Sequence, residues 1–259
     1  MAPKSDERTI LGVRFYVGNA DGAFERLRSG GLMMAPAAPA LKDIATSPAY
    51  RDALLQADVV ITDSAFMVLL WNLMERDSIQ RVSGLGFLRT LLQQEDVRKP
   101  GNTLWVMASP QSAQKNLEWL VAQGVAVPAD CVYLAPLYGE IVEDRALVER
   151  IRQSGIRHVV VTIGGGTQER LGLYLKSQLD RHTGIYCIGA AIAFLSGDQV
   201  HIPEWADRLY LGWLFRCISS PRRYVPRYWS AWQLLPLLWR YRSVLPPASA
   251  EFVQSGGPS

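Results

Sequence analysis

Short, nearly continuous apolar runs alternate along this chain with segments whose apolar residues recur at helical spacing. Strands that are apolar on both faces and are joined by helices are typical of a parallel sheet covered by helices on both sides. The sequence therefore predicts an α/β, Rossmann-like fold over residues 1–200. The runs lie at 58–62, 103–109, 131–136, 158–164 and 185–189, and the helical patterns at 47–57, 64–74, 86–94, 110–124, 142–155 and 167–179.

Local signals support particular elements within this pattern. Ser47 followed by Pro48 is typical of an N-cap and first helical position, so a helix should begin there. The β signal opens with "ILGVRFYV" at 10–17. In the helical pattern that begins at residue 64, Phe66, Leu69, Leu70 and Leu73 recur at helical spacing, and we expect them to be core.

After residue 200 the composition changes. Residues 201–245 read as a helical appendage interrupted by prolines, and residues 246–259 as a disordered tail. The stretch 211–242 carries six arginines, four tryptophans and three tyrosines, with no lysine or acidic residue. It contributes +6 to a formal net charge of +3, so the rest of the chain sums to −3. Such a mixture is typical of a membrane interface, and we expect Trp229, Trp232 and Trp239 to favour a bilayer surface over pure packing.

Composition also limits the function classes. The three cysteines have no CxxC spacing and the three histidines are scattered, so we expect no disulfide framework, no metal site and no cofactor. The apolar runs are far shorter than the roughly 20 residues that span a bilayer, and the N-terminus shows no apolar signal region. We therefore expect a cytoplasmic protein.

Two places just after predicted strands could carry chemistry, because ligands of open parallel sheets bind beyond the carboxyl ends of the strands. Asp63 stands at the end of "VVITD", either as a helix N-cap or as a general base. Gly164, Gly165 and Gly166 lie between a predicted strand and a helix, where a backbone can approach a phosphate closely. This loop is neither a Walker loop nor a complete GxGxxG motif.

In combination, the motifs resemble those of the WecG/TagA/CpsF glycosyltransferases, from about Ile10 to Tyr228. The resemblance depends on "ADVVITDS", "RVSG" at 81–84, "GGGTQE" and "GAAIAFLSG". It is strongest in "HIPEWADRLYLGWLFRCISSPRRYVPRY".

This resemblance implies an inverting transfer of a sugar from a UDP-sugar to an undecaprenyl-diphosphate-linked acceptor on the inner face of the cell membrane, for a cell-surface polysaccharide. Asp63 matches the family's proposed catalytic base. Arg216, Arg223 and Arg227 match arginines suited to gripping a diphosphate. The resemblance places further substrate contacts at Gly164, Gly165, Gly166, Gln168, Glu169, Ser64 and Arg81. No DxD pair occurs in the chain, so metal bound in that manner is unsupported.

Several positions depart from the family pattern. The family's Thr-Pro-Asn segment falls on "APA", so Ala35 and Ala37 replace the polar residues there. Other departures are Ser64, Gly86, His201 and Gly212. These changes put an N-acetylmannosamine donor in doubt and leave room for a different sugar.

The main alternative is a noncatalytic homologue that binds a lipid-linked saccharide or a partner enzyme. A nicotinamide-dependent oxidoreductase is disfavoured, because the first predicted βα turn, "VGNADGAF", lacks GxGxxG. A nucleic-acid binder is disfavoured because the chain outside 211–242 is net acidic. The sequence leaves a homo-oligomer open.

Overall fold

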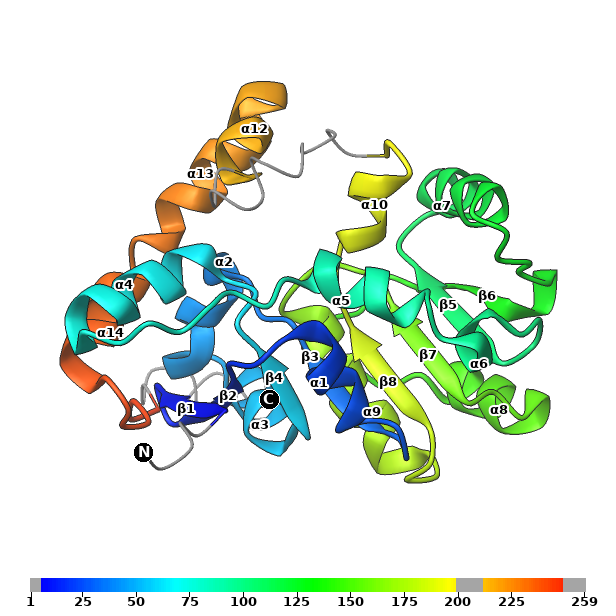
Figure 1. Ribbon diagram of the computed structural model, residues 1–259, viewed down its shortest axis with the longest axis horizontal. Coiled ribbons are helices and arrows are strands. Elements are labelled where there is room, and N and C mark those ends of the chain that lie inside the picture. The colour runs from blue at the N-terminus through cyan, green and yellow to red at the C-terminus, as the bar shows by residue number, and fades with distance from the viewer. Residues whose placement is uncertain (1–5, 199–211, 249–259) are drawn as a thin grey trace, which may run out of the picture.

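The computed structural model describes residues 6–198 and 212–248. One eight-stranded sheet runs through it in the order β1-β2-β4-β3-β8-β7-β5-β6, and every neighbouring pair is parallel except β1 with β2 (Figure 1). The predicted α/β fold with a parallel sheet is confirmed. The strands are β1 Glu7–Ile10, β2 Val13–Tyr16, β3 Gly31–Met34, β4 Val59–Ile61, β5 Thr103–Met107, β6 Val132–Leu134, β7 His158–Val161 and β8 Gly184–Cys187.

Helices cover both faces of the sheet and form two separate cores. Successive side chains of a strand point to opposite faces, so Leu32 and Met34 join one core while Met33 joins the other. The first face is covered by α2 Ala38–Leu41, α3 Pro48–Gln56, α4 Ala65–Glu75, α8 Arg145–Ser154 and α9 Thr167–Gln178. The second is covered by α1 Ala20–Glu25, α5 Gly84–Leu91, α6 Glu95–Arg98, α7 Pro110–Ala122 and α10 Ala191–Leu195.

The run 10–17 is not one strand. Leu11 and Gly12 both have positive φ, at 50° and 78°, and Ile10 pairs with Val13, so the run turns back on itself as a two-residue hairpin. Turns of this kind require φ above zero at both central positions, which glycine supplies freely. The predicted helix start at Ser47 and Pro48 is confirmed, since the Ser47 hydroxyl accepts a hydrogen bond from the Tyr50 N–H.

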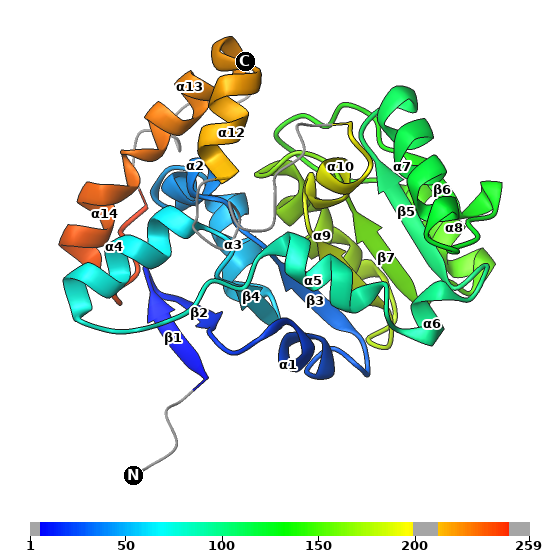
Figure 2. The ribbon, with the colours of Figure 1, turned by 45° about the horizontal axis from the view of Figure 1, so that its top comes forward.

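The C-terminal part forms three further helices, α12 Gly212–Ser219, α13 Pro221–Ala231 and α14 Leu234–Tyr241. They lie above α2 and beside α4 in Figure 2. Ala231, Leu234 and Leu238 are buried in the first core, whereas Trp229, Trp232 and Trp239 are exposed. Helices α13 and α14 are therefore amphipathic, with one side packed on the α/β domain, whereas α12 buries no residue.

The chain then returns to the hairpin at the edge of the sheet. The N–H groups of Leu11 and Gly12 donate to the carbonyls of Arg242 and Ser243. Pro246, which the sequence placed in a disordered tail, is buried, and its carbonyl accepts from Arg51. Residues 249–259 of that predicted tail lie outside the described residues. No helix within residues 6–198 and 212–248 is long and apolar enough to cross a bilayer.

The core prediction for α4 holds in part: Phe66 and Leu70 are partly buried against the first core, but it is wrong for Leu69 and Leu73. Met67, Val68 and Trp71 are the residues that α4 buries, while the Leu69 and Leu73 side chains are 52% and 79% exposed. The helical spacing correctly identified an apolar stripe on α4, but no described element covers Leu69 and Leu73.

Candidate active site

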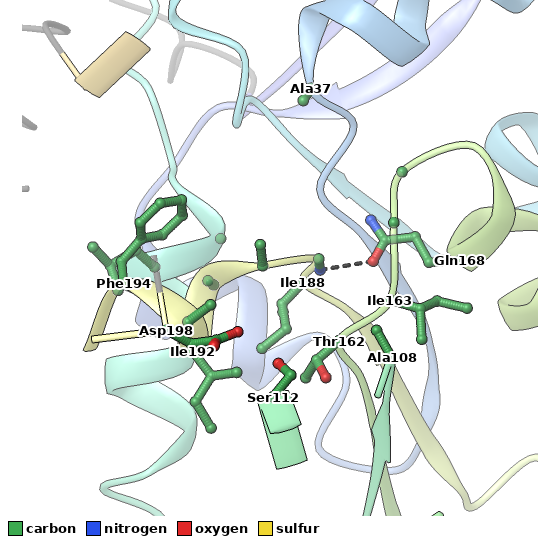
Figure 3. A pocket seen from close by; sticks show the side chains of 18 of the residues that line it. Ala37, Ala108, Ser112, Thr162, Ile163, Gln168, Ile188, Ile192, Phe194 and Asp198 are labelled. Carbon is green, nitrogen blue, oxygen red and sulfur yellow. Dashed lines mark hydrogen bonds between the residues drawn. The ribbon is translucent and has the colours of Figure 1, made fainter. Parts of the chain in front are cut away.

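A cavity of about 490 Å³ opens at the carboxyl ends of the central strands. Residues that follow β3, β4, β5, β7 and β8 contribute to its wall, and Arg216, Tyr224 and Arg227 reach it from the C-terminal helices. Figure 3 shows Ala37 at one end and Ser112, Thr162 and Asp198 toward the other. The site predicted from strand ends thus lies where two halves of the sheet and the C-terminal helices meet.

Asp63 lines this cavity directly after β4. Its Oδ1 accepts a hydrogen bond from the Gly84 N–H at 2.9 Å and lies 3.5 Å from Nη2 of Arg81. Its side chain keeps 23% exposure. The alternative that Asp63 caps the next helix is wrong, because the Ser64 hydroxyl accepts from the Met67 N–H and caps α4. Asp63 is therefore a partly exposed carboxylate with one oxygen fixed.

The predicted contacts Arg81 and Ser64 support Asp63 in different ways. Arg81 lines the cavity, and its Nε donates to the backbone carbonyl of Asp63 at 2.7 Å. Ser64 is buried and does not belong to the cavity wall, so the structure gives it a capping role in place of the expected substrate contact.

The glycine-rich loop after β7 forms another part of the wall. Gly164, Gly165 and Gln168 line the cavity, whereas Gly166 does not. Gly166 has φ 88°, which other residues rarely adopt, and a Cβ on Gly164 would meet no heavy atom within 4 Å. The backbone is therefore open to close approach by a ligand. Oε1 of Gln168 accepts from the Gly189 N–H at 2.7 Å (Figure 3), which joins this loop to the segment after β8.

Glu169 is completely buried and does not line the cavity, so the predicted direct contact with a ligand is wrong. Its Oε2 accepts from the Gly166 N–H at 2.6 Å and its Oε1 from Nε2 of Gln168 at 3.1 Å. Burial raises the pKa of this carboxyl group, although both hydrogen bonds oppose the shift. Glu169 therefore holds the loop and the Gln168 amide in place.

Two of the three predicted arginines reach the cavity. The Arg216 guanidinium lies 4.2 Å from the centroid of the Phe194 ring, and its Nη1 donates to the Tyr228 hydroxyl at 3.0 Å. Its Nε is buried and has no hydrogen-bond partner among the described residues. A Cβ on Gly165 would lie 4.0 Å from Nη2 of Arg227. Arg223 belongs to α13, but its side chain lies outside the described residues.

The sequence reasoning missed a polar group on the far side of the cavity. Ser109, Ser112 and Thr162 line it there, together with Lys115 and Asp198, whose Nζ and Oδ1 are 3.3 Å apart. Ser109 follows β5 and caps α7, and its place at a strand end was the signal that could have revealed this region.

Two of the departures from the family pattern, Ala35 and Ala37, lie on the cavity wall. Both follow β3, so this wall presents methyl groups to the cavity. Gly86 lies in the first turn of α5 with its N–H bonded to Ser83, and Gly212 begins α12. His201 lies outside the described residues. Within the described residues no group of three His, Cys, Asp or Glu side chains could hold a metal ion.

Comparison with known proteins agrees with this geometry. Residues 8–246 match the model of the "Glycosyl transferase WecG/TagA/CpsF family". The chain is also 23% identical over 185 residues to the N-acetylglucosaminyldiphosphoundecaprenol N-acetyl-beta-D-mannosaminyltransferase of Bacillus subtilis (strain 168), covering 69% of this chain and 70% of that protein. Because the family match spans nearly the whole chain, this protein belongs to the WecG/TagA/CpsF family of glycosyltransferases.

Proposed function

We propose that the protein is an inverting glycosyltransferase that moves a sugar from a UDP-sugar to an undecaprenyl-diphosphate-linked acceptor in cell-surface polysaccharide synthesis. One observation carries the proposal: the Asp63 carboxylate, the glycine-rich loop and the arginines of the C-terminal helices meet in one cavity. The name of the Bacillus subtilis relative includes both a sugar transfer and an undecaprenol-linked acceptor.

Asp63 would act as the general base. The acceptor hydroxyl would attack the anomeric carbon of the donor while the bond from that carbon to UDP breaks, and its proton would pass to Asp63. Displacement in one step from the opposite side inverts the configuration at that carbon. The hydrogen bond from Gly84 fixes one carboxylate oxygen, so the other can face the acceptor.

Arg216 and Arg227 would stabilise the negative charge on the departing UDP. Arg216 lines the cavity and the Arg227 guanidinium lies beside Gly165, so both cations could meet a diphosphate there. Fixed cations in a partly closed cavity stabilise a developing anion without reorganisation. Gln168 and the loop at Gly164 and Gly165 would contact the nucleotide side of the donor.

Because the proposed acceptor carries a lipid chain, the reaction would take place at a membrane surface. We place the protein in the cytoplasm, peripherally attached to the inner face of the cell membrane, with the exposed tryptophans of the C-terminal helices in contact with lipid. The alanines at 35 and 37 favour a donor other than a UDP-N-acetylmannosamine type, because they offer the sugar no hydrogen-bond partner.

The test is transfer of label from a panel of UDP-sugars to an undecaprenyl-diphosphate-linked mono- or disaccharide. The wild type should give labelled lipid with at least one donor. Asp63→Asn should lower turnover roughly 10²- to 10⁴-fold while UDP still binds. Asp52→Asn, on the exposed side of α3, is the matched control and should be unaffected. UDP binding with no transfer from any donor would favour the noncatalytic homologue.

A further inference from the structure

Helix α4 carries an apolar stripe that the described part of the protein leaves uncovered. Leu69 and Leu73 are four residues apart and therefore lie on the same side of the helix, at 52% and 79% exposure. No charged residue occurs between Ala65 and Met74. Neighbouring large apolar side chains exposed together are typical of an interaction surface, so this uncovered pair indicates a missing partner.

This stripe continues onto the C-terminal helices. Phe66 precedes Leu69 by three residues and shares its side of α4, and the Phe66 ring meets the Trp232 ring edge-on with centroids 5.4 Å apart. Trp229 precedes Trp232 by three residues and is 76% exposed. Leu69, Leu73, Trp229 and Trp232 are named here the apolar face. In both ribbon views α4 lies alongside α13 and α14 (Figures 1 and 2).

The charges around the apolar face indicate which kind of partner binds it. Residues 212–248 contain no acidic side chain and six arginines. Glu75, the only carboxylate of α4, is paired with Arg242 at 3.0 Å. Arg222 and Arg240 lie outside the cavity and are exposed on the same helices as the tryptophans. Helices that expose both tryptophan rings and arginines suit the headgroup depth of a bilayer, where rings insert and arginines meet lipid phosphates.

We propose that the apolar face docks on an anionic phospholipid bilayer, so that α4 of the α/β domain enters the membrane interface together with the C-terminal helices. The purpose of this docking rests on the function proposed above. Asp63 precedes α4 by two residues, and Arg227 of the cavity precedes Trp229 by two. Contact with the bilayer through both α4 and α13 would fix the orientation of the cavity toward a lipid-linked acceptor.

Flotation of the purified full-length protein with vesicles tests this. On vesicles that mix phosphatidylglycerol with phosphatidylcholine, the wild type should float, and Leu69→Glu/Leu73→Glu should lower its partitioning at least about tenfold. Val121→Glu/Leu137→Glu replaces two apolar side chains that are at least as exposed, near the opposite edge of the sheet, and should float as the wild type does. Leu69→Gln/Leu73→Gln should give a smaller loss, and thermal unfolding should show all variants folded.

Equal flotation of the wild type and Leu69→Glu/Leu73→Glu would overturn the proposal. So would a shift from oligomer to monomer in sedimentation without a change in flotation, because the apolar face would then join copies of this chain. Transfer to a short-chain, water-soluble acceptor without vesicles should be unchanged in this variant. If neither the wild type nor Leu69→Glu/Leu73→Glu transfers sugar, the proposed function fails. The flotation result still tests whether the apolar face docks on a bilayer.

Discussion

The backbone N–H of Gly84 donates a hydrogen bond to Oδ1 of Asp63 across 2.9 Å. Gly84 is the last residue of the "RVSG" motif and the first of α5, so the start of one helix fixes the carboxylate at the end of a strand 21 residues earlier. Arg81 of the same motif holds the Asp63 carbonyl. The "RVSG" motif therefore positions Asp63, the proposed base. This role explains why the motif helps to identify the site from the sequence.

Gly84→Ala should lower turnover with little effect on UDP affinity. An added Cβ would lie 3.3 Å from the Ile188 carbonyl oxygen and 3.4 Å from the Ala35 Cβ, and we expect α5 to relieve this crowding by moving a few tenths of an ångström, which lengthens the hydrogen bond to Asp63. Loss of one hydrogen bond to a charged group is worth about 1.5–3 kcal/mol. We expect kcat to fall roughly tenfold or more in the transfer assay, with UDP binding measured by calorimetry. Gly139→Ala, where a Cβ meets nothing within 4 Å, should behave as the wild type, and equal kcat values in the two variants would contradict this role.

Glu169→Gln should weaken UDP binding although Glu169 is absent from the cavity wall. The carboxylate accepts from both Gly166 and Gln168, whereas a glutamine amide has one acceptor oxygen and would turn its NH₂ toward the second donor. The loop and the Gln168 amide should lose their fixed positions, and the Kd for UDP should rise about tenfold. Glu118→Gln, on the exposed side of α7, is the control. A variant that loses thermal stability but binds UDP normally would show a purely structural role.

Arg216→Lys should weaken UDP binding although it keeps the charge. Lysine cannot stack a planar group on Phe194 while donating to both the Tyr228 hydroxyl and a diphosphate, so we expect a loss of about 1.5–3 kcal/mol, roughly 10- to 100-fold in Kd. Arg222→Lys, at an exposed position of α13, should leave the Kd unchanged. If both substitutions weaken binding equally, the effect is general electrostatics and the assigned role of Arg216 is wrong.

Much of the fold was predictable because apolar strands and helix caps are local signals. Ser47, for example, caps its helix as its sequence context indicates. The hairpin at Leu11 and Gly12 was missed because the apolar run starts at Ile10, the last residue of β1, while the rest of that strand is polar and gives no apolar signal. Leu69 and Leu73 were misplaced for a different reason: helical spacing identifies an apolar stripe, but only the tertiary structure shows which elements cover it.

The candidate site was predictable in part. Asp63, Gly164 and Arg216 were found from strand ends and motifs, and the structure brings them to one cavity. Ser109, Lys115 and Asp198 were missed because each reads as an ordinary cap or surface charge until α7 and the segment after α10 are placed together. Glu169 was assigned a ligand contact because the motif shows its importance but not its burial.

His158 should make the free energy of unfolding depend on pH between about 7 and 5.5. It begins β7, with Nδ1 3.1 Å from the Tyr186 hydroxyl and Nε2 3.0 Å from Asp96. Burial lowers its pKa from the usual value of about 6.5, against the attraction of Asp96 and with a smaller contribution from Arg157 in the same direction. The folded state thus favours the neutral ring. This contribution is fully present above about pH 6.5 and is lost as the pH falls through the lowered pKa, by at most about 1.4 kcal/mol per pH unit.

Urea unfolding of the wild type, His158→Gln and His182→Gln at both pH values measures this effect. The wild type and His182→Gln, whose histidine is exposed, should lose stability on acidification, while His158→Gln should lose less. The hydrogen bond from His158 also lowers the pKa of Asp96, so that carboxylate titrates below the tested range. The comparison therefore isolates the histidine. An identical loss in all three proteins would mean that His158 does not titrate differently in the folded and unfolded chains.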